Sequence, residues 1–285
     1  MYPNETSSSQ SPQSLKLPPY KDVVFRRLFG NSEDTGPLLN LLNGILDWEE
    51  PIVKIILQPN ELSEGPAWEK RPALDLRAED GQSRLYNIEV QLTRQEFYAE
   101  RALYYWSKVH ASQLKTGDSY GKLRTTVGIH FLDWLIDWGD EIESKQDREF
   151  WSMFQVMDPV HGRVLTQQLM LHMIEMPALN KTPEELTSAR ERWIYFVHKG
   201  HKLTEAQVES MGDDIKQANT KLMRLSQEQA LWHTMESIER AERDRMAFFQ
   251  DHLYVLQQKI DKAEEKAQQA EEKAQQAEEK ANQAE

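Results

Sequence analysis

Two short stretches with alternating apolar and polar residues decide the fold: RPALDLRA at residues 71–78 and LYNIEVQL at residues 85–92. Strict alternation is typical of a β-strand with one face in the core and the other face free. The link between them, residues 79–83, contains an Asp-Gly pair, which favours positive φ and a tight connection. The sequence therefore predicts a β-hairpin at this point.

Three polar side chains are expected to lie together on this hairpin. Asp75 stands between two leucines on the first strand, while Glu89 and Gln91 are two apart on the second and share a face. Two carboxylates on adjacent strands repel each other, and Mg²⁺ would relieve that repulsion while placing a hard cation beside a phosphate. The residues alone also allow a plainer interpretation, in which these groups lie on an exposed sheet face.

The segments around the hairpin have helical and strand patterns. Residues 21–30 predict a short amphipathic helix that ends at Gly30. In it, Asp22 and Arg26 are four apart, so they form either a surface ion pair or part of a helix that contributes a polar group to the carboxylate patch. A helix over residues 96–114 and a strand over residues 125–132 follow, and a right-handed crossover would place that strand in the same sheet. Further elements are expected at residues 37–46 (helix), 52–57 (strand) and 150–158 with 165–176 (an added hairpin).

After Pro177 the pattern is helical. Thr182 is expected to cap a helix that runs to Gly200, and residues 204–260 are predicted to be helical with a break at residues 211–212. The chain then repeats the heptad AEEKAQQ from Ala263, with apolar residues continuing the same spacing upstream at Phe249, Leu253, Leu256 and Ile260. An alanine seam buries little surface, so weak self-association and a solvated single helix with Glu-Lys pairs at or near i, i+4 are both open.

Composition limits the class of protein. The net charge of the 285 residues is −13; residues 261–285 hold eight acids and four lysines, net −4, so the remainder carries −9. This argues against non-specific coating of nucleic acid, and a nuclease would need a locally basic cleft. There is no cysteine, no apolar run near ~20 residues and no N-terminal signal pattern, which predicts a soluble, cytoplasmic protein without membrane contact.

A set of segments in a fixed order resembles a known family. The helix at residues 21–30, the pair LDL (74–76) and NIEVQ (87–91), YYW (104–106), and IEMP (174–177) before WIYF (193–196) are similar to the family of recombination-promoting nucleases (Rpn) and transposase-like proteins, in the PD-(D/E)XK nuclease superfamily. The resemblance implies an α/β, restriction-endonuclease-like core with a mixed sheet flanked by helices, followed by an α-helical region with a heptad-repeat tail. The expected divisions are a disordered arm (1–19), the nuclease-like domain (20–180), a helical region (181–260) and the tail (261–285).

The resemblance also implies roles for residues of the hairpin. Asp75 matches the first metal-binding carboxylate and Glu89 the second, the Val90 backbone carbonyl is a further ligand, and Asp22 matches an additional acidic site. The metal would be Mg²⁺ or Mn²⁺. Gln91 stands where most of the superfamily has lysine; the family itself carries glutamine there, which can hydrogen-bond to water or substrate but cannot carry charge.

Two functions follow as hypotheses. The first is a divalent-metal-dependent DNA endonuclease, linked by resemblance to recombination or mobile DNA, in which local basic residues hold the DNA backbone: Lys21, Arg26, Arg27, Lys70, Arg71, Lys108 and Lys115. The alternative is a catalytically silent scaffold that recruits partners through its helical C-terminal region. The nuclease requires Asp75 and Glu89 to share one site, whereas the scaffold does not.

Overall fold

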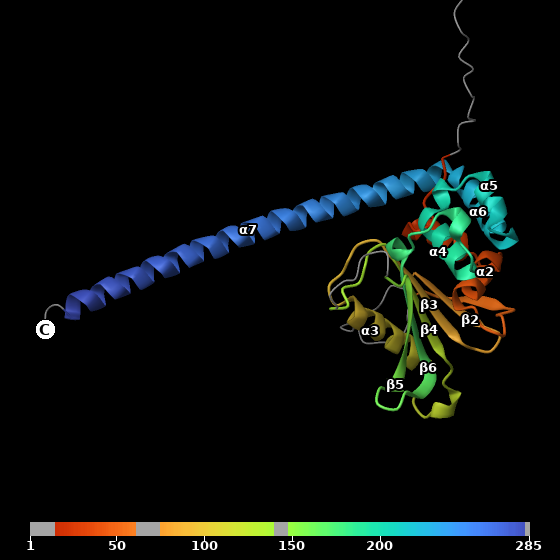
Figure 1. Cartoon of the computed structure of the whole chain (residues 1–285), viewed down its shortest axis with the longest axis horizontal. Helices are drawn as coiled ribbons and strands as arrows, with labels where there is room; N and C mark the ends of the chain where they lie inside the picture. The colour runs from red at the N-terminus through yellow and green to blue at the C-terminus, as the bar shows by residue number, and fades with distance from the viewer. Residues whose placement is uncertain (1–14, 61–74, 140–147, 283–285) are drawn as a thin grey trace, which may run out of the picture. The chain divides into compact units, whose positions relative to one another are not determined.

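The structure is a computed structural model that describes residues 15–60, 75–139 and 148–282. The expectations for residues 1–14, for the strand start at 71–74, for Lys70 and for Arg71 lie outside these ranges, as does the end of the tail at 283–285. The chain divides after Leu231 into two units. The first unit contains the sheet and the six α-helices that precede the long C-terminal helix (Figure 1).

One mixed sheet of six strands forms the centre of the first unit, in the order β1-β2-β3-β4-β6-β5. The strands are β1 (Ile55–Gln58), β2 (Leu76–Asp80), β3 (Leu85–Gln91), β4 (Thr126–Leu132), β5 (Trp151–Asp158) and β6 (Arg163–Glu175). β1, β2 and β3 are antiparallel neighbours, β3, β4 and β6 run parallel, and β5 returns antiparallel to β6. The predicted hairpin is therefore β2–β3, and the predicted crossover runs from β3 through α3 (Tyr98–Ala111) to β4.

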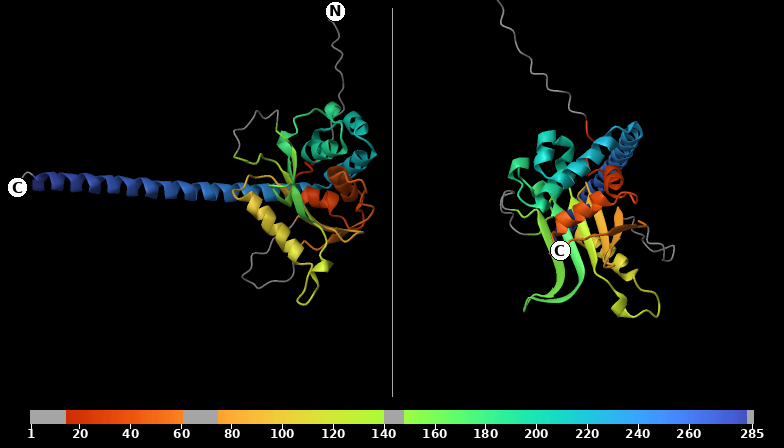
Figure 2. Two further views of the ribbon diagram at one scale, coloured as in Figure 1. Left: turned by 60° about the horizontal axis from the view of Figure 1, so that its bottom comes forward. Right: turned by 90° about the vertical axis from the view of Figure 1, so that its right-hand side faces the viewer.

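Helices cover both faces of this sheet. Neighbouring residues of β4 point to opposite faces: Leu132 packs with Tyr98 and Ala102 of α3, whereas the ring of Phe131 lies 5.9 Å from that of Phe25 in α1. All seven residues of β4 are buried, as expected for a parallel strand between two helical layers. Figure 2 shows α3 on one side of the sheet and the other helices of this unit on the opposite side. These are α1 (Asp22–Phe29), α2 (Gly36–Leu46), α4 (Ala189–Lys199), α5 (Glu205–Ser210) and α6 (Asp213–Ser226).

The second helical layer is tightly packed. Trp193 of α4 is fully buried against Phe29, and a Cβ atom at Gly44 of α2 would collide with its indole ring. Glycine at this position therefore allows α2 and α4 to approach closely. Short 3₁₀ turns complete the unit at Tyr120–Lys122, Met176–Ala178, Pro183–Glu185 and Gly200–Lys202.

The mixed α/β fold expected from the sequence is confirmed, but three local predictions were wrong. β3 has no free face, because its residues from Tyr86 to Val90 are all buried. The hairpin link places its positive φ at Ser83 (59°) and not at the glycine of the Asp-Gly pair. Thr182 precedes a single 3₁₀ turn, and α4 begins only at Ala189, capped by Ser188 and Glu191.

The C-terminal unit consists of α7 (Gln229–Asn282), a long helix that begins in the first unit. Its residues from 236 to 264 are mostly exposed. No helix in the part of the chain that the structure describes is long and apolar enough to cross a membrane.

Candidate active site

Asp75 lies immediately before β2 and is held by three hydrogen bonds. One carboxylate oxygen accepts a bond of 2.8 Å from the Val90 backbone amide, and the other accepts a bond of 2.8 Å from the Arg26 guanidinium. Its backbone carbonyl accepts from the Asn60 side chain at 2.9 Å. The Val90 amide of β3 thus donates to the Asp75 side chain and not to a backbone carbonyl of β2. This bond fixes Asp75 beside β3.

Glu89 is almost completely buried, at 2% exposure, and one of its carboxylate oxygens, Oε1, has no hydrogen-bond partner among the described residues. Burial and the nearby Asp75 carboxylate raise the pKa of Glu89 to about 8, while the positive charge of Arg101 opposes this rise. The plainer interpretation, in which these acids lie on an exposed sheet face, is therefore wrong. A buried carboxylate with an open oxygen beside a second carboxylate has a strong electrostatic preference for a cation.

Arg26 connects the first helix to this pair. Its guanidinium lies 3.4 Å from the Asp22 carboxylate and 2.8 Å from that of Asp75. The two interpretations of residues 22 and 26 thus hold together, because the i, i+4 pair exists and the helix also contributes a polar group to the carboxylate site. Asp22 itself is more than half exposed, and the Arg26 guanidinium contacts both it and Asp75.

Helix α3 adds residues that the sequence reasoning did not single out. Tyr98 is buried with its hydroxyl 2.9 Å from Nδ1 of His130, and the Arg101 guanidinium lies 4.8 Å from the centre of the Tyr105 ring. Their spacing of three and four residues places all three α3 side chains on one helical face. That spacing is visible in the sequence, but the sequence predicted only a helix over residues 96–114 and no role for this face.

Gln91 belongs to a chain of amide contacts that begins at Arg101. The Arg101 guanidinium donates to the side-chain oxygen of Gln95 at 2.6 Å, and the Gln95 amide donates to the side-chain oxygen of Gln91 at 3.1 Å. The hydrogen bond from Gln95 fixes the orientation of the Gln91 side chain, because it binds the side-chain oxygen. Its amide nitrogen is then the group available to donate a hydrogen bond.

The donor set fits a hard divalent cation with few protein ligands. Within the ranges that the structure describes, no three His, Cys, Asp or Glu side chains gather as a metal cluster, so Asp22 does not complete a three-carboxylate site. Mg²⁺, however, is commonly held by only one or two carboxylates, with water and substrate phosphate filling its other positions. Asp75 and Glu89 meet that requirement, and the open oxygen of Glu89 is the observation that favours it.

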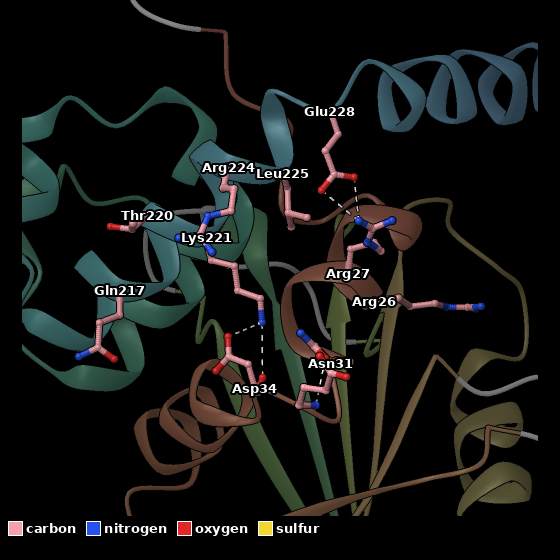
Figure 3. A pocket seen from close by; sticks show the side chains of 12 residues that line it. Arg26, Arg27, Asn31, Asp34, Gln217, Thr220, Lys221, Arg224, Leu225 and Glu228 are labelled. Carbon is pink, nitrogen blue, oxygen red and sulfur yellow. Dashed lines mark hydrogen bonds and ion pairs between the residues drawn. The ribbon is translucent and has the colours of Figure 1, made fainter.

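Two cavities are lined by residues that flank the pair, although neither lining includes Asp75 or Glu89. One, of about 740 Å³, lies between α1 and α6 and includes Arg26 in its wall (Figure 3). The other, of about 540 Å³, includes Tyr98 and three further aromatic residues, Phe97, Trp134 and Trp138. Arg26, which binds Asp75, thus also lines the first cavity, and Tyr98, which binds His130, also lines the second.

Of the residues predicted from the sequence, the structure brings Asp75, Glu89, Val90 and Gln91 to one end of the β2–β3 hairpin. Among the predicted basic residues, Arg26 contacts Asp75 directly, Arg27 is bound to Glu228, and Lys108 lies over Tyr104.

A family described as PD-(D/E)XK nuclease family transposase matches residues 19–252 of the chain. This range includes the whole sheet, the carboxylate pair and the first part of α7. None of the curated proteins and none of the solved structures matches the chain.

Proposed function

The chain belongs to the PD-(D/E)XK nuclease family transposases, and on this premise we propose that it is a divalent-metal-dependent DNA endonuclease that hydrolyses phosphodiester bonds. The observation that carries the proposal is the buried Glu89 carboxylate, which has an unpartnered oxygen and lies beside Asp75. A protein that needed these acids only for folding would gain stability by pairing them fully.

Asp75, Glu89 and the Val90 backbone carbonyl would hold the cation, for which Mg²⁺ or Mn²⁺ is the candidate. When bound, such an ion stabilises negative charge on a phosphate and lowers the pKa of water. Arg26 balances the charge of Asp75 and keeps its carboxylate in place, while Arg101 is the positive charge that most favours the ionised form of Glu89.

Gln91 would position water or a phosphate oxygen by donating from its amide. Because its own oxygen is bound by Gln95, the amide is presented in one orientation. A glutamine cannot take up a proton or add positive charge, so charge stabilisation has to come from the cation and from the two arginines, Arg26 and Arg101.

The cavity between α1 and α6 offers a path for the DNA backbone next to this site. In Figure 3, Arg27 is joined to Glu228, and Lys221 is joined to Asp34. Arg224 makes no ion pair within the described residues, so its charge is available to a phosphate. Such a local site would allow a protein with a formal charge of −13 to hold DNA. The family's description as transposases supports a biological role in recombination or mobile DNA.

A plasmid cleavage assay with the full chain tests the proposal. Supercoiled DNA is incubated with Mg²⁺ or Mn²⁺, and with EDTA as the metal-free control. We expect Glu89→Gln and Asp75→Asn to lower the cleavage rate at least about 100-fold, because losing ~3 kcal/mol of charge stabilisation has that effect on a rate.

The matched control is Glu79→Gln. Glu79 lies on β2, is partly exposed and accepts a hydrogen bond from Gln58, so its loss is expected to leave cleavage unchanged. Circular dichroism spectra of the four proteins check that all are folded. Cleavage by Glu89→Gln at the parent's rate would refute the site, and no cleavage by the parent with either metal would favour the scaffold.

A further inference from the structure

Helix α7 exposes large apolar side chains in a heptad pattern. Phe249, Leu253, Leu256 and Ile260 are 55%, 64%, 41% and 50% exposed. They are separated alternately by four and three residues, and Met246 extends the pattern by one position. Such spacing places them on one stripe of the helix, which is stable in water when a second helix covers it.

The charged residues of the tail do not stabilise this helix by themselves. In the heptad AEEKAQQ each lysine follows the two glutamates by two and one positions, and precedes the next two by five and six. Lysine and glutamate therefore never stand at i, i+3 or i, i+4 within the three copies, which are the spacings at which side chains meet on one helix. The pairing that would support a solvated single helix is absent from the repeat.

The spacing of lysine and glutamate in the repeat does allow ion pairs between two helices. With Met246 and Leu253 at heptad position a, and Phe249 and Leu256 at d, the lysines of the repeat fall at g and a glutamate falls at each e. In a parallel coiled coil, each g side chain meets the e side chain five residues later on the partner helix. Lys259 then faces Glu264, and Lys266 faces Glu271, in both directions across the interface.

We propose that residues 246–281 form a parallel, in-register, two-stranded coiled coil with a second copy of this chain. The charges select the direction as well as the partner. An antiparallel pair would set g beside g and e beside e, which brings lysine to lysine and glutamate to glutamate. The charges of the alanine heptads select the parallel direction. The apolar residues at 246–260 supply most of the buried surface and select the in-register pairing, because a slip of seven residues would leave some of them uncovered.

Parallel pairing leaves both N-terminal units at the same end of the coiled coil. Resting on the proposed nuclease function, this gives each assembly two carboxylate pairs, one for each strand of a DNA duplex. A dimeric parent should then linearise plasmid in one encounter, whereas a monomeric variant should accumulate nicked circles. The dimer is tested by measuring the mass of the protein in solution, which does not depend on DNA cleavage.

The first experiment measures the mass of the full chain by sedimentation equilibrium. We expect twice the 33.4 kDa of one chain for the parent, and one chain mass for Leu256→Asp, whose charge enters the seam. The matched control is Val255→Asp, because Val255 is the adjacent apolar residue with 48% exposure but lies at position c, outside the seam. A monomeric or three-chain parent, or equal masses for the two variants, would overturn the proposal.

The second experiment tests direction and exploits the absence of cysteine from the chain. Phe249→Cys places one thiol in the seam near the N-terminal end of the coiled coil. In a parallel, in-register dimer the two thiols are adjacent, so mild oxidation should link the two copies. In an antiparallel dimer these thiols would be far apart. Because antiparallel helices pair position a with position d, Phe249→Cys would instead cross-link to Ala281→Cys when the two variants are mixed. That mixed product would overturn the parallel arrangement.

A charge exchange tests the pairing itself. Lys266→Glu should weaken the dimer a few-fold, as expected for the loss of exposed ion pairs at a helix interface. Adding Glu271→Lys to the same chain restores opposite charges and should restore the parent's dissociation constant. A double variant weaker than the single one would show that these residues do not face each other.

Discussion

Strand β2 carries a buried acid close to each end, and the two acids differ in how well they are bonded. Asp80 at its C-terminal end is 4% exposed and accepts four hydrogen bonds, from the Tyr86 hydroxyl, the Arg84 side chain and the backbone amides of Gln82 and Arg84. At the other end, Asp75 shares its site with Glu89, which keeps an unpartnered oxygen. Both regions therefore bury an acid, but both carboxylate oxygens of Asp80 have hydrogen-bond partners, whereas one oxygen of Glu89 has none among the described residues.

The pKa values of the buried acids are shifted in opposite directions in the two regions. Burial opposes ionisation of Asp80, but the bonds from Tyr86, Arg84 and the backbone outweigh it and lower its pKa below the ordinary value. At Glu89, burial and the Asp75 charge raise the pKa to about 8. The bonds to Asp80 hold a turn in place, whereas full ionisation of the Asp75–Glu89 pair needs further positive charge, which a bound cation would supply.

The largest effect on stability is expected at the fully bonded acid. Asp80→Ala removes every acceptor from a buried site and leaves Arg84 and Tyr86 without their partner, which costs about 3–5 kcal/mol for a buried pair. Urea unfolding measures the loss, and Glu79→Gln on the same strand should change stability by less than about 0.5 kcal/mol. Metal-dependent cleavage by the fraction that remains folded should persist. A stable but inactive Asp80→Ala protein would contradict the division between the two ends.

The general placement of this site followed from the sequence. Alternation in β2 and β3, with a helix before β4, is enough to bring Asp75 and Glu89 to neighbouring strands, since strand pairing depends on local pattern and short connections. The metal-binding roles proposed for them come from the resemblance. The sequence could not reveal that both faces of β3 are covered, because alternation in a short strand does not say what packs on its polar side.

The contacts that tune the site depend on tertiary packing. Arg26 reaches Asp75 across 49 residues of sequence, and Arg101 acts on Glu89 from the crossover helix. Neither pair has a fixed spacing that a sequence pattern would show. The missed N-terminus of α4 has a similar cause, because Thr182 and Ser188 both begin capping boxes and only the packed helix distinguishes them.

The next effect concerns the pH dependence of stability without metal. Since the folded-state pKa of Glu89 is raised from 4.5 to about 8, its contribution is fully present below pH 4.5 and is lost as the pH rises through about 8. The melting temperature in EDTA should therefore fall between pH 6 and pH 9, by roughly 2–4 °C for each kcal/mol lost. Glu89→Gln should flatten this fall, and Mg²⁺ should reverse it in the parent. A fall that persists unchanged in Glu89→Gln would assign it to other groups.

The smallest effect is expected from the arginine that faces Glu89 from α3. Arg101→Gln removes the attraction that lowers the Glu89 pKa, so the loss of stability in EDTA should move to higher pH, by up to about one unit for an interaction of ~1.4 kcal/mol. Lys108→Gln removes the same charge from the same helix two turns further along, where solvent screens it, and should leave the pH midpoint unchanged. Melting curves of both variants across the same pH range provide the comparison. An unchanged pH midpoint in Arg101→Gln would mean that this guanidinium does not act on Glu89, and the charge balance of the open pair would then rest on Arg26 alone among the described arginines.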